Sequence, residues 1–314
     1  MFTEILAAIN NSKKIIILPH KSADGDCLGS AFALKLMLKS VGKEVVVLLE
    51  EKGPLPRICD ILFGVEDECE IDNDLVICVD CGDEGRLGER ISFFEKCCNT
   101  VNLDHHPTNT NFAIHNYVNS TASATGEIIF ELAKGMDIEI DKKIATNLYI
   151  AIVSDTGGFS YANTKPQTHR IAAELLETGI DHAAINQFLF DSNSITRLML
   201  MKEALNSLEV YEDGKIAIIS ITQEQIKNAG AEEDDAGGLI SLARSLDTAK
   251  VSLCIKEQNS CNEVRVSMRS NIIDVSEISK KFGGGGHVRA SGCTIKADMK
   301  TAKAMLLGEI EKQL

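Results

Sequence analysis

The chain has 314 residues, of which 44% are hydrophobic and 25% charged, a composition typical of a globular protein with a sizeable core and room for two domains. Residues 1–210 contain 31 acidic and 18 basic side chains, and residues 211–314 contain 15 and 14, for a net charge of −14. A protein that follows long nucleic acids needs a basic stripe, so this distribution argues against long-polymer binding. The chain can still act on small anionic substrates if bound metal ions reverse the local charge.

The termini and the cysteines bear on the cellular compartment. No apolar run reaches the roughly 18 residues of a membrane span, and the amino terminus lacks a basic start and a small-residue cleavage site. The ten cysteines are scattered, which is typical of a reducing compartment. Cys78 and Cys81 form an isolated CxxC, which we interpret as two small buried residues. We therefore expect a cytoplasmic protein that does not bind membranes.

Short apolar runs and helical patterns alternate through the first 190 residues. We predict strands at residues 14–18, 44–49, 74–80 and 100–104. Helical periodicity covers residues 28–42, 123–135, 142–155, 167–179 and 181–191. This βαβ rhythm predicts an α/β domain over residues 1–190, with a parallel sheet that has helices on both faces.

A second domain follows. Residues 191–210 begin with a polar patch and continue with a helical pattern, which predicts a linker helix. Strand patterns then recur at residues 215–221, 250–257, 263–270 and 289–297, with helices between and after them. We therefore expect a smaller α/β domain over residues 211–314.

Carboxylate and imidazole side chains follow the predicted strands of the first domain, or end one of its helices. They are His20, Asp24, Asp26, Asp80, Asp104, His105, His106 and Asp155. A single Asp after a strand is most often a cap or turn residue, but ligands of open parallel sheets bind beyond the carboxyl ends of the strands, where most of these residues fall. Gathered carboxylates repel one another unless cations lie between them. Oxygen and imidazole donors suit Mn²⁺ or Mg²⁺, with Fe²⁺, Co²⁺ or Zn²⁺ as competitors, and the set is large enough for two ions.

The second domain contains a cationic pattern. In residues 263–270, Arg265, Ser267 and Arg269 alternate with apolar residues, so they are predicted to share one face of a strand. Four glycines and a histidine follow at residues 283–287. We expect this run to be a loop in which backbone N–H groups, including those of Gly285 and Gly286, bind an anion together with His287 and the arginines.

The stretches "HKSADGD", "VICVDCGD", "NLDHHPTN", "SATGEIIFEL", "IVSDTGGFSYANT" and "VRVSMRS" with "FGGGGHVRASG" occur in this order along nearly the whole chain. Together they resemble the DHH phosphoesterase superfamily with a C-terminal DHHA1 domain, of the bifunctional oligoribonuclease and phosphoadenosine-phosphate phosphatase (NrnA-like) type. The sequence departs from the family pattern at one visible position. There Gly158 follows Gly157 where members often carry a polar or basic residue.

The resemblance implies roles for individual residues. It implies that His20, Asp24 and Asp80 hold one Mn²⁺ ion, and that Asp26, Asp80, His105 and Asp155 hold a second. It further implies that His106 faces the scissile phosphate and that Asp104 orients the two histidines. In the second domain, Arg265, Ser267, Arg269 and His287 would bind the terminal phosphate or nucleotide of the substrate.

The function that the resemblance implies is manganese-dependent hydrolysis. The substrates would be oligonucleotides of two to about five units, cleaved to mononucleotides, and 3′,5′-bisphosphoadenosine (PAP), converted to AMP. A linear or cyclic dinucleotide phosphodiesterase would use the same metal ligands. A non-catalytic nucleic-acid-binding module is a further alternative, which metal content would test. A family II pyrophosphatase is disfavoured by the "GGGGH" run. The other partner that we consider is a second copy of the chain, which would form a homodimer.

Overall fold

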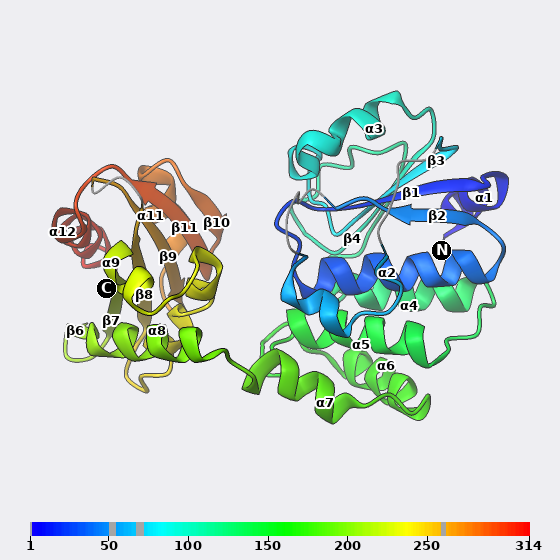
Figure 1. Ribbon diagram of the computed structural model, residues 1–314. Helices are drawn as coiled ribbons and strands as arrows, with labels where there is room; N and C mark the ends of the chain where they lie inside the picture. The colour runs from blue at the N-terminus through cyan, green and yellow to red at the C-terminus, as the bar shows by residue number, and fades with distance from the viewer. Residues whose placement is uncertain (1, 50–54, 67–71, 259–261) are drawn as a thin grey trace. The chain divides into compact units, whose positions relative to one another are not determined.

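The computed structural model describes residues 2–49, 55–66, 72–258 and 262–314. The chain divides into two units, Met1–Ser192 and Asn193–Leu314, each with its own sheet (Figure 1). Within the described ranges, no helix combines the length and the apolar character that a membrane crossing requires.

The first unit is built on a parallel sheet of five strands in the order β2-β1-β3-β4-β5. The strands are β1 (Lys14–Pro19), β2 (Glu44–Val47), β3 (Leu75–Val79), β4 (Thr100–Asp104) and β5 (His115–Val118). The first four occupy the predicted runs. The sequence analysis missed β5, because its four residues form no apolar run and are only half-buried at the sheet edge.

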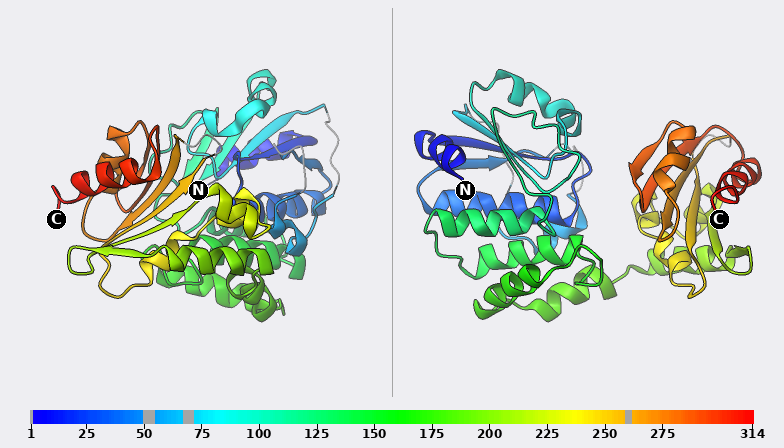
Figure 2. Two further views of the ribbon diagram at one scale, coloured as in Figure 1. Left: turned by 60° about the vertical axis from the view of Figure 1, so that its left-hand side comes forward. Right: turned by 180° about the vertical axis from the view of Figure 1, so that it is seen from behind.

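Helices cover both faces of this sheet, as predicted. They are α1 (Thr3–Asn11), α2 (Gly25–Ser40), η1 (Arg57–Ile61), η2 (Glu84–Arg90), α3 (Ile91–Lys96), α4 (Thr125–Gly135), α5 (Lys142–Asp155), α6 (Pro166–Glu177), α7 (His182–Asn186) and η3 (Gln187–Asp191). Helices α2, α4 and α5 lie under one face and α3 over the other, while α6 and α7 form an outer layer (Figures 1 and 2). Alternate strand residues serve the two cores: Ile15 and Ile17 pack with the α2 layer, Ile16 and Leu18 with the α3 side.

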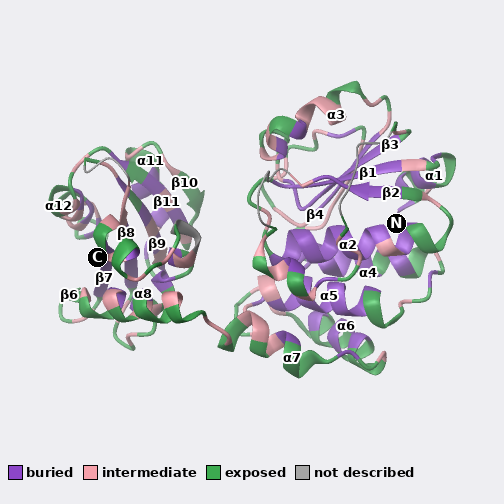
Figure 3. Cartoon of the chain, in the orientation of Figure 1, coloured by how far each residue is buried: buried purple, intermediate pink, exposed green. Residues whose placement is uncertain are grey.

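Helix α2 is the central element of the larger core. Most of its residues are buried, and it carries no polar stripe (Figure 3). A Cβ atom on Gly29 would lie 2.6 Å from Asn147 O and 2.9 Å from Ala151 N, so this glycine lets α2 and α5 approach closely. The helix starts at Gly25, earlier than predicted, because the Asp24 side chain accepts a hydrogen bond from Cys27 N and caps it.

The second unit contains a mixed sheet of six strands in the order β10-β11-β9-β8-β7-β6. The strands are β6 (Glu209–Tyr211), β7 (Ile216–Ile221), β8 (Val251–Glu257), β9 (Val264–Ser270), β10 (Gly285–His287) and β11 (Ala290–Ile295). Its helices are α8 (Ile195–Asn206), α9 (Gln223–Asn228), η4 (Glu233–Ala236), α10 (Ile240–Arg244), α11 (Val275–Lys281) and α12 (Met299–Ile310). Only β7 and β8 pair in parallel; the other neighbours are antiparallel.

Candidate metal centre

The sheet order brings the polar side chains of the first unit to one edge. Strands β1, β3 and β4 are neighbours, and their carboxyl ends lead directly into His20, Asp80 and the pair Asp104-His105. Asp26 reaches this edge from the first turn of α2, and Asp155 from the last turn of α5. Segments far apart in the sequence therefore converge on one place.

Asp80 lies at the centre of the cluster. Its Oδ2 atom is 3.5 Å from His20 Nε2, and its Oδ1 atom is 3.6 Å from His105 Nε2. The two oxygens of one carboxylate thus face two different imidazoles. His105 Nε2 also lies 3.8 Å from Asp26 Oδ2 and 3.8 Å from Asp155 Oδ2, whereas Asp24 Oδ1 lies 3.9 Å from His20 Nε2.

The backbone of Asp80 is held in a strained conformation. Its φ of 59° is left-handed, which costs on the order of 1–3 kcal/mol for a non-glycine residue and persists only where the surroundings enforce it. Asp80 N donates to Leu103 O at 2.9 Å, and the next carbonyl, Cys81 O, accepts from the side chains of Asn102 and Asn109 at 3.0 and 2.9 Å. The Thr125 hydroxyl donates to Asp80 Oδ1 at 2.8 Å and fixes the carboxylate.

Asp26 is tied to the amino end of another helix. It is 1% exposed, and its two oxygens accept from Thr125 N at 2.7 Å and Gly126 N at 3.0 Å in the first turn of α4. This helix end carries partial positive charge and favours a carboxylate. Burial and the neighbouring charges of Asp80 and Asp155 nevertheless raise the pKa of Asp26 well above its ordinary value.

The donor set fits divalent cations. Burial raises the pKa of Asp155 to about 6, and burial acts on Asp80 in the same direction, but the hydrogen bond with His20 and the charges of His105 and His106 bring the pKa of Asp80 down to about 2. The carboxylates of this site thus need positive charge beside them. Three groups of donors, Asp26-His105-Asp155, Asp80-His105-His106 and His20-Cys27-Asp80, each lie within 4.8 Å. Carboxylate oxygen and imidazole nitrogen are the ligands of Mn²⁺ and related ions.

Cys27, a member of one of these donor groups, is hydrogen-bonded on both sides. Its Sγ atom accepts from His20 N at 3.1 Å and donates to Val79 O at 3.4 Å. Burial raises the pKa of the thiol well above its ordinary value. Through these two contacts Cys27 links the ends of β1 and β3.

His106 is oriented by Asp104, which is fully buried. His106 Nδ1 lies 2.7 Å from Asp104 Oδ1, a contact that raises the pKa of His106 to about 9. Asp104 Oδ1 also accepts from His105 N at 2.9 Å, and its Oδ2 accepts from Asn109 Nδ2 at 2.5 Å. The contact with Asp104 therefore favours the protonated form of the His106 ring and holds its direction.

The sequence analysis missed three residues that position the cluster. Thr125 and Asn109 hold Asp80 and Asp104, and Asn163 Nδ2 donates to Asp155 Oδ2 at 3.3 Å. Each lies inside a stretch that carried the family resemblance, so the sequence pointed to the right segments but not to these residues. The fold then shows which carboxylate each of these three side chains contacts.

In the second unit, β9 presents the predicted alternation. Val264, Val266 and Met268 are buried, while Arg265 is exposed and Ser267 and Arg269 are half-buried. The register places Arg269 opposite Ala290, and Ala290 opposite His287, so arginine and histidine lie in one row across three strands. Residues in one row point to the same face of the sheet, so Arg269 and His287 share one face.

The glycine run differs from the expected loop. Gly285–His287 form the edge strand β10, which pairs antiparallel with β11. The expected anion-binding loop is therefore wrong in form, because an extended edge strand directs its backbone groups alternately toward and away from its partner. The glycines still allow the backbone to pack closely against β11, because a Cβ atom on Gly284 would lie 2.2 Å from Gly292 O.

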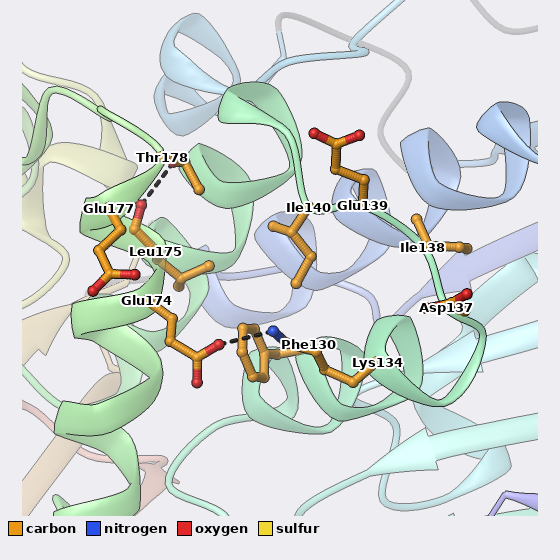
Figure 4. Close-up of a pocket in the computed structure, with 10 residues that line it drawn as sticks. All are labelled: Phe130, Lys134, Asp137, Ile138, Glu139, Ile140, Glu174, Leu175, Glu177 and Thr178. Atoms are coloured by element: carbon orange, nitrogen blue, oxygen red, sulfur yellow. Dashed lines mark hydrogen bonds and ion pairs between the residues drawn. The ribbon is translucent and has the colours of Figure 1, made fainter.

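A cavity of about 510 Å³ on the first unit lies away from this cluster (Figure 4). Its walls are the carboxyl ends of α4 and α6 and the turn at residues 136–141. The ammonium group of Lys134 pairs with Glu174 at 2.8 Å and lies 5.2 Å from the centre of the Phe130 ring. None of the clustered Asp and His residues lines it, so the hollow is unrelated to the metal centre.

Comparison with known proteins agrees with this arrangement. Residues 14–152 match the DHH family, N-terminal domain, and residues 213–313 match the DHHA1 domain. The chain is 30% identical to the bifunctional oligoribonuclease and PAP phosphatase NrnA of Thermus thermophilus, over 100% of this chain and 94% of that protein. It is 26% identical to the cyclic-di-AMP phosphodiesterase PdeA of Listeria monocytogenes, over 98% of this chain and 47% of that protein. An exopolyphosphatase-related protein of Bacteroides fragilis has a similar structure, with a TM-score of 0.91, 26% identity, and coverage of 99% and 95%.

Proposed function

This chain belongs to the DHH phosphoesterase family and carries a DHHA1 domain, and we propose that it hydrolyses short oligonucleotides to mononucleotides and PAP to AMP. The observation that carries the proposal is the buried pair Asp26 and Asp80 with His20 and His105 around it, in a chain similar to NrnA over its full length. Enzymes of this family depend on metal ions, and the clustered donors suit them.

We propose two manganese ions at this site, with Mg²⁺, Fe²⁺ or Co²⁺ as substitutes. His20, Asp24 and Asp80 would hold one ion, and Asp26, His105, Asp155 and again Asp80 the other. This sharing is supported by the two oxygens of Asp80, which face different histidines. When bound, divalent cations polarise the phosphoryl group and offset the charge that develops on its oxygens during in-line displacement.

The chain's own residues supply orientation and a proton. We propose that His106 donates a proton to the leaving oxygen as water displaces it from phosphorus. The support is its contact with Asp104, which raises the pKa of the ring and fixes its direction. Thr125 and Asn109 hold Asp80 and Asp104 in place, so the reacting groups need little rearrangement.

The second unit is proposed to bind the far phosphate or nucleotide of the substrate. The residues are Arg265, Ser267, Arg269, Gly285, Gly286 and His287. Support comes from the shared row of Arg269 and His287 and from the small residue between them. Recognition of one end would favour substrates of two to about five nucleotides, because a site of this kind accepts a small ligand.

Product analysis tests the substrate class. Manganese-loaded protein would be incubated with end-labelled RNA and DNA of two to ten nucleotides and, in parallel, with PAP. We expect mononucleotides from the shortest chains and AMP from PAP. Equal rates on the longest and shortest chains would contradict the preference for short substrates.

A second candidate is a phosphodiesterase of cyclic or linear dinucleotides. The similarity to PdeA, a protein named as a cyclic-di-AMP phosphodiesterase, favours it. The same experiment separates the two candidate functions when cyclic di-AMP and the linear dinucleotide pApA are added as substrates.

We also predict a cytoplasmic location and a homodimer for this chain.

A further inference from the structure

Two exposed aromatic rings lie against the glycine pair that follows Asp155. Helix α5 ends at Asp155, and Gly157 and Gly158 come two and three residues later. A Cβ atom on Gly157 would lie 2.4 Å from Tyr161 Cζ, and one on Gly158 would lie 3.4 Å from Phe190 Cε2. Each ring thus rests against glycine backbone, while Tyr161 remains 49% exposed and Phe190 44% exposed.

The backbone that carries Tyr161 is hydrogen-bonded to the end of α5. Gly157, Gly158 and Phe159 have φ values of 55°, 64° and 66°, and this tight reversal turns the chain back on itself. Tyr161 N donates to Thr156 O at 3.0 Å, and Gly158 N donates to Val153 O at 2.8 Å. These bonds join the segment to the end of α5 that carries Asp155.

Phe190 belongs to a segment that is also anchored to the first unit. In η3, the neighbouring Phe188 ring lies 4.4 Å from the Arg57 guanidinium. Both terminal nitrogens of Arg57 donate to Ser192, one to its carbonyl and one to its hydroxyl, at 2.9 Å each. Both exposed rings are thus parts of the unit that contains the metal centre.

We propose that Tyr161 and Phe190 form a stacking platform for the nucleobase next to the scissile phosphate. Gly157 is two residues from Asp155, at most about 7 Å of extended chain, which places the rings within reach of a nucleotide whose phosphate lies at the cluster. Exposed aromatic rings are surfaces on which bases stack, whatever the base, because every base has a flat π-face. Gly158 offers no polar side chain that would read a base edge, so the platform accepts all four bases.

This proposal rests on the proposed nucleotide substrate and makes it more specific. The chain contains no tryptophan, so the substitution Tyr161→Trp gives a protein with a single fluorescent indole beside Gly157. We expect pApA to quench this fluorescence, and a diphosphate of the same length without bases to leave it unchanged. Ile114→Trp is the matched control. Ile114 is 59% exposed and precedes β5, so it lies at the amino-terminal ends of the strands, whereas the metal centre lies at their carboxyl ends. Neither ligand should change the fluorescence of that variant.

Hydrolysis supplies the second measurement. We expect Tyr161→Ala to raise KM for pApA about 5- to 150-fold, the range that stacking of one base corresponds to. The KM for the substrate without bases should change less than twofold, and Tyr161→Phe, which keeps the ring, should behave as the unsubstituted protein. Equal effects of Tyr161→Ala on both substrates, or quenching that does not depend on the base, would overturn the platform.

The two proposals fail in different ways. If the unsubstituted protein hydrolyses no nucleotide but pApA quenches the tryptophan at position 161, the platform stands and the proposed reaction is wrong. If it hydrolyses pApA and the tryptophan does not respond to bases, only the platform is wrong. Neither hydrolysis nor quenching would reject both.

Discussion

The two units present their polar side chains in opposite ways. In the first unit, His20 and Asp80 are buried at strand ends and Asp26 in the first turn of α2, and each is held by hydrogen bonds or ion contacts from distant segments. In the second unit, Arg265 is exposed and Arg269 half-buried on one face of β9, where simple alternation places them. A change in the first unit should therefore spread through a network, whereas a change in the second should affect the altered contact alone.

The largest expected effect comes from Asp80→Asn. Asparagine tolerates the left-handed backbone of this position, so the substitution removes charge and leaves the fold in place. We expect hydrolysis to fall about 10³-fold or more, with loss of bound metal. Steady-state kinetics and metal analysis of the purified variant provide the measurement. Full activity and unchanged metal content would show that Asp80 is not at the centre of the site.

Asn109→Ala tests whether the network of the first unit matters beyond the cluster itself. The side chain donates to Cys81 O and to Asp104 Oδ2, so its loss should disorder both Asp80 and His106. Partners of this kind are typically worth 10- to 100-fold in activity, and we expect about that loss in kcat. Asn116→Ala is the control, because the Asn116 side chain donates to the carbonyls of Asn111 and Ala113 and accepts from Ala113 N, all beside β5. Equal losses in both variants would argue for a general effect on the sheet.

Arg269→Ala should act on binding alone. Removal of the half-buried Arg269 guanidinium from β9 should raise KM for short oligonucleotides about 10-fold, as expected for a hydrogen bond to a charged group, with kcat unchanged. The rise should shrink as salt is added, since salt screens exposed charges. Lys300→Ala removes an exposed charge from α12 and should leave KM as it is. An unchanged KM for Arg269→Ala would remove the second unit from substrate binding.

Divalent cations should stabilise only one of the two units. Because the carboxylates of the first unit repel one another without cations, manganese at about 100 times its Kd should raise the melting temperature of that unit by about 5–10 °C. The second unit should melt at the same temperature with and without manganese. Calorimetry or hydrogen exchange resolves the two units, and an equal shift in both would contradict this division.

The smallest effects concern the glycine run of the second unit. Gly286 has a φ of 137°, and a Cβ atom there would lie 2.6 Å from Ala290 O, so Gly286→Ala should destabilise the second unit by about 1–3 kcal/mol. Gly285 has nothing within 4 Å of a Cβ position, and Gly285→Ala should stay within about 0.5 kcal/mol. Chemical denaturation followed in the second unit compares the pair. Similar losses in both would mean that the strain lies elsewhere in β10.

Particular elements show how far local patterns carry. The apolar runs of β1 to β4 and the periodicity of α4, α5 and α6 predict these elements, because burial on both faces or on one stripe leaves a direct mark on the sequence. Strand β5 leaves no such mark, since its side chains are half-buried at an edge, and its partner β4 alone decides its place. Strand β10 reads as a glycine loop because its pairing with β11, not its own residues, makes it a strand.

The sequence by itself determined the donors of the site, their order along the chain and the alternation of β9, because residue type and spacing are local properties. Only the tertiary structure decided that the two oxygens of Asp80 face different histidines, that Asn109 and Thr125 hold the neighbouring carboxylates, and that Tyr161 lies over Gly157. Asp80 meets His20 and Thr125 across tens of residues of sequence, and these contacts depend on strand order and helix packing, which no short stretch of sequence specifies. Asn109 with Asp104 and Tyr161 with Gly157 are contacts within a single loop, whose geometry the fold sets.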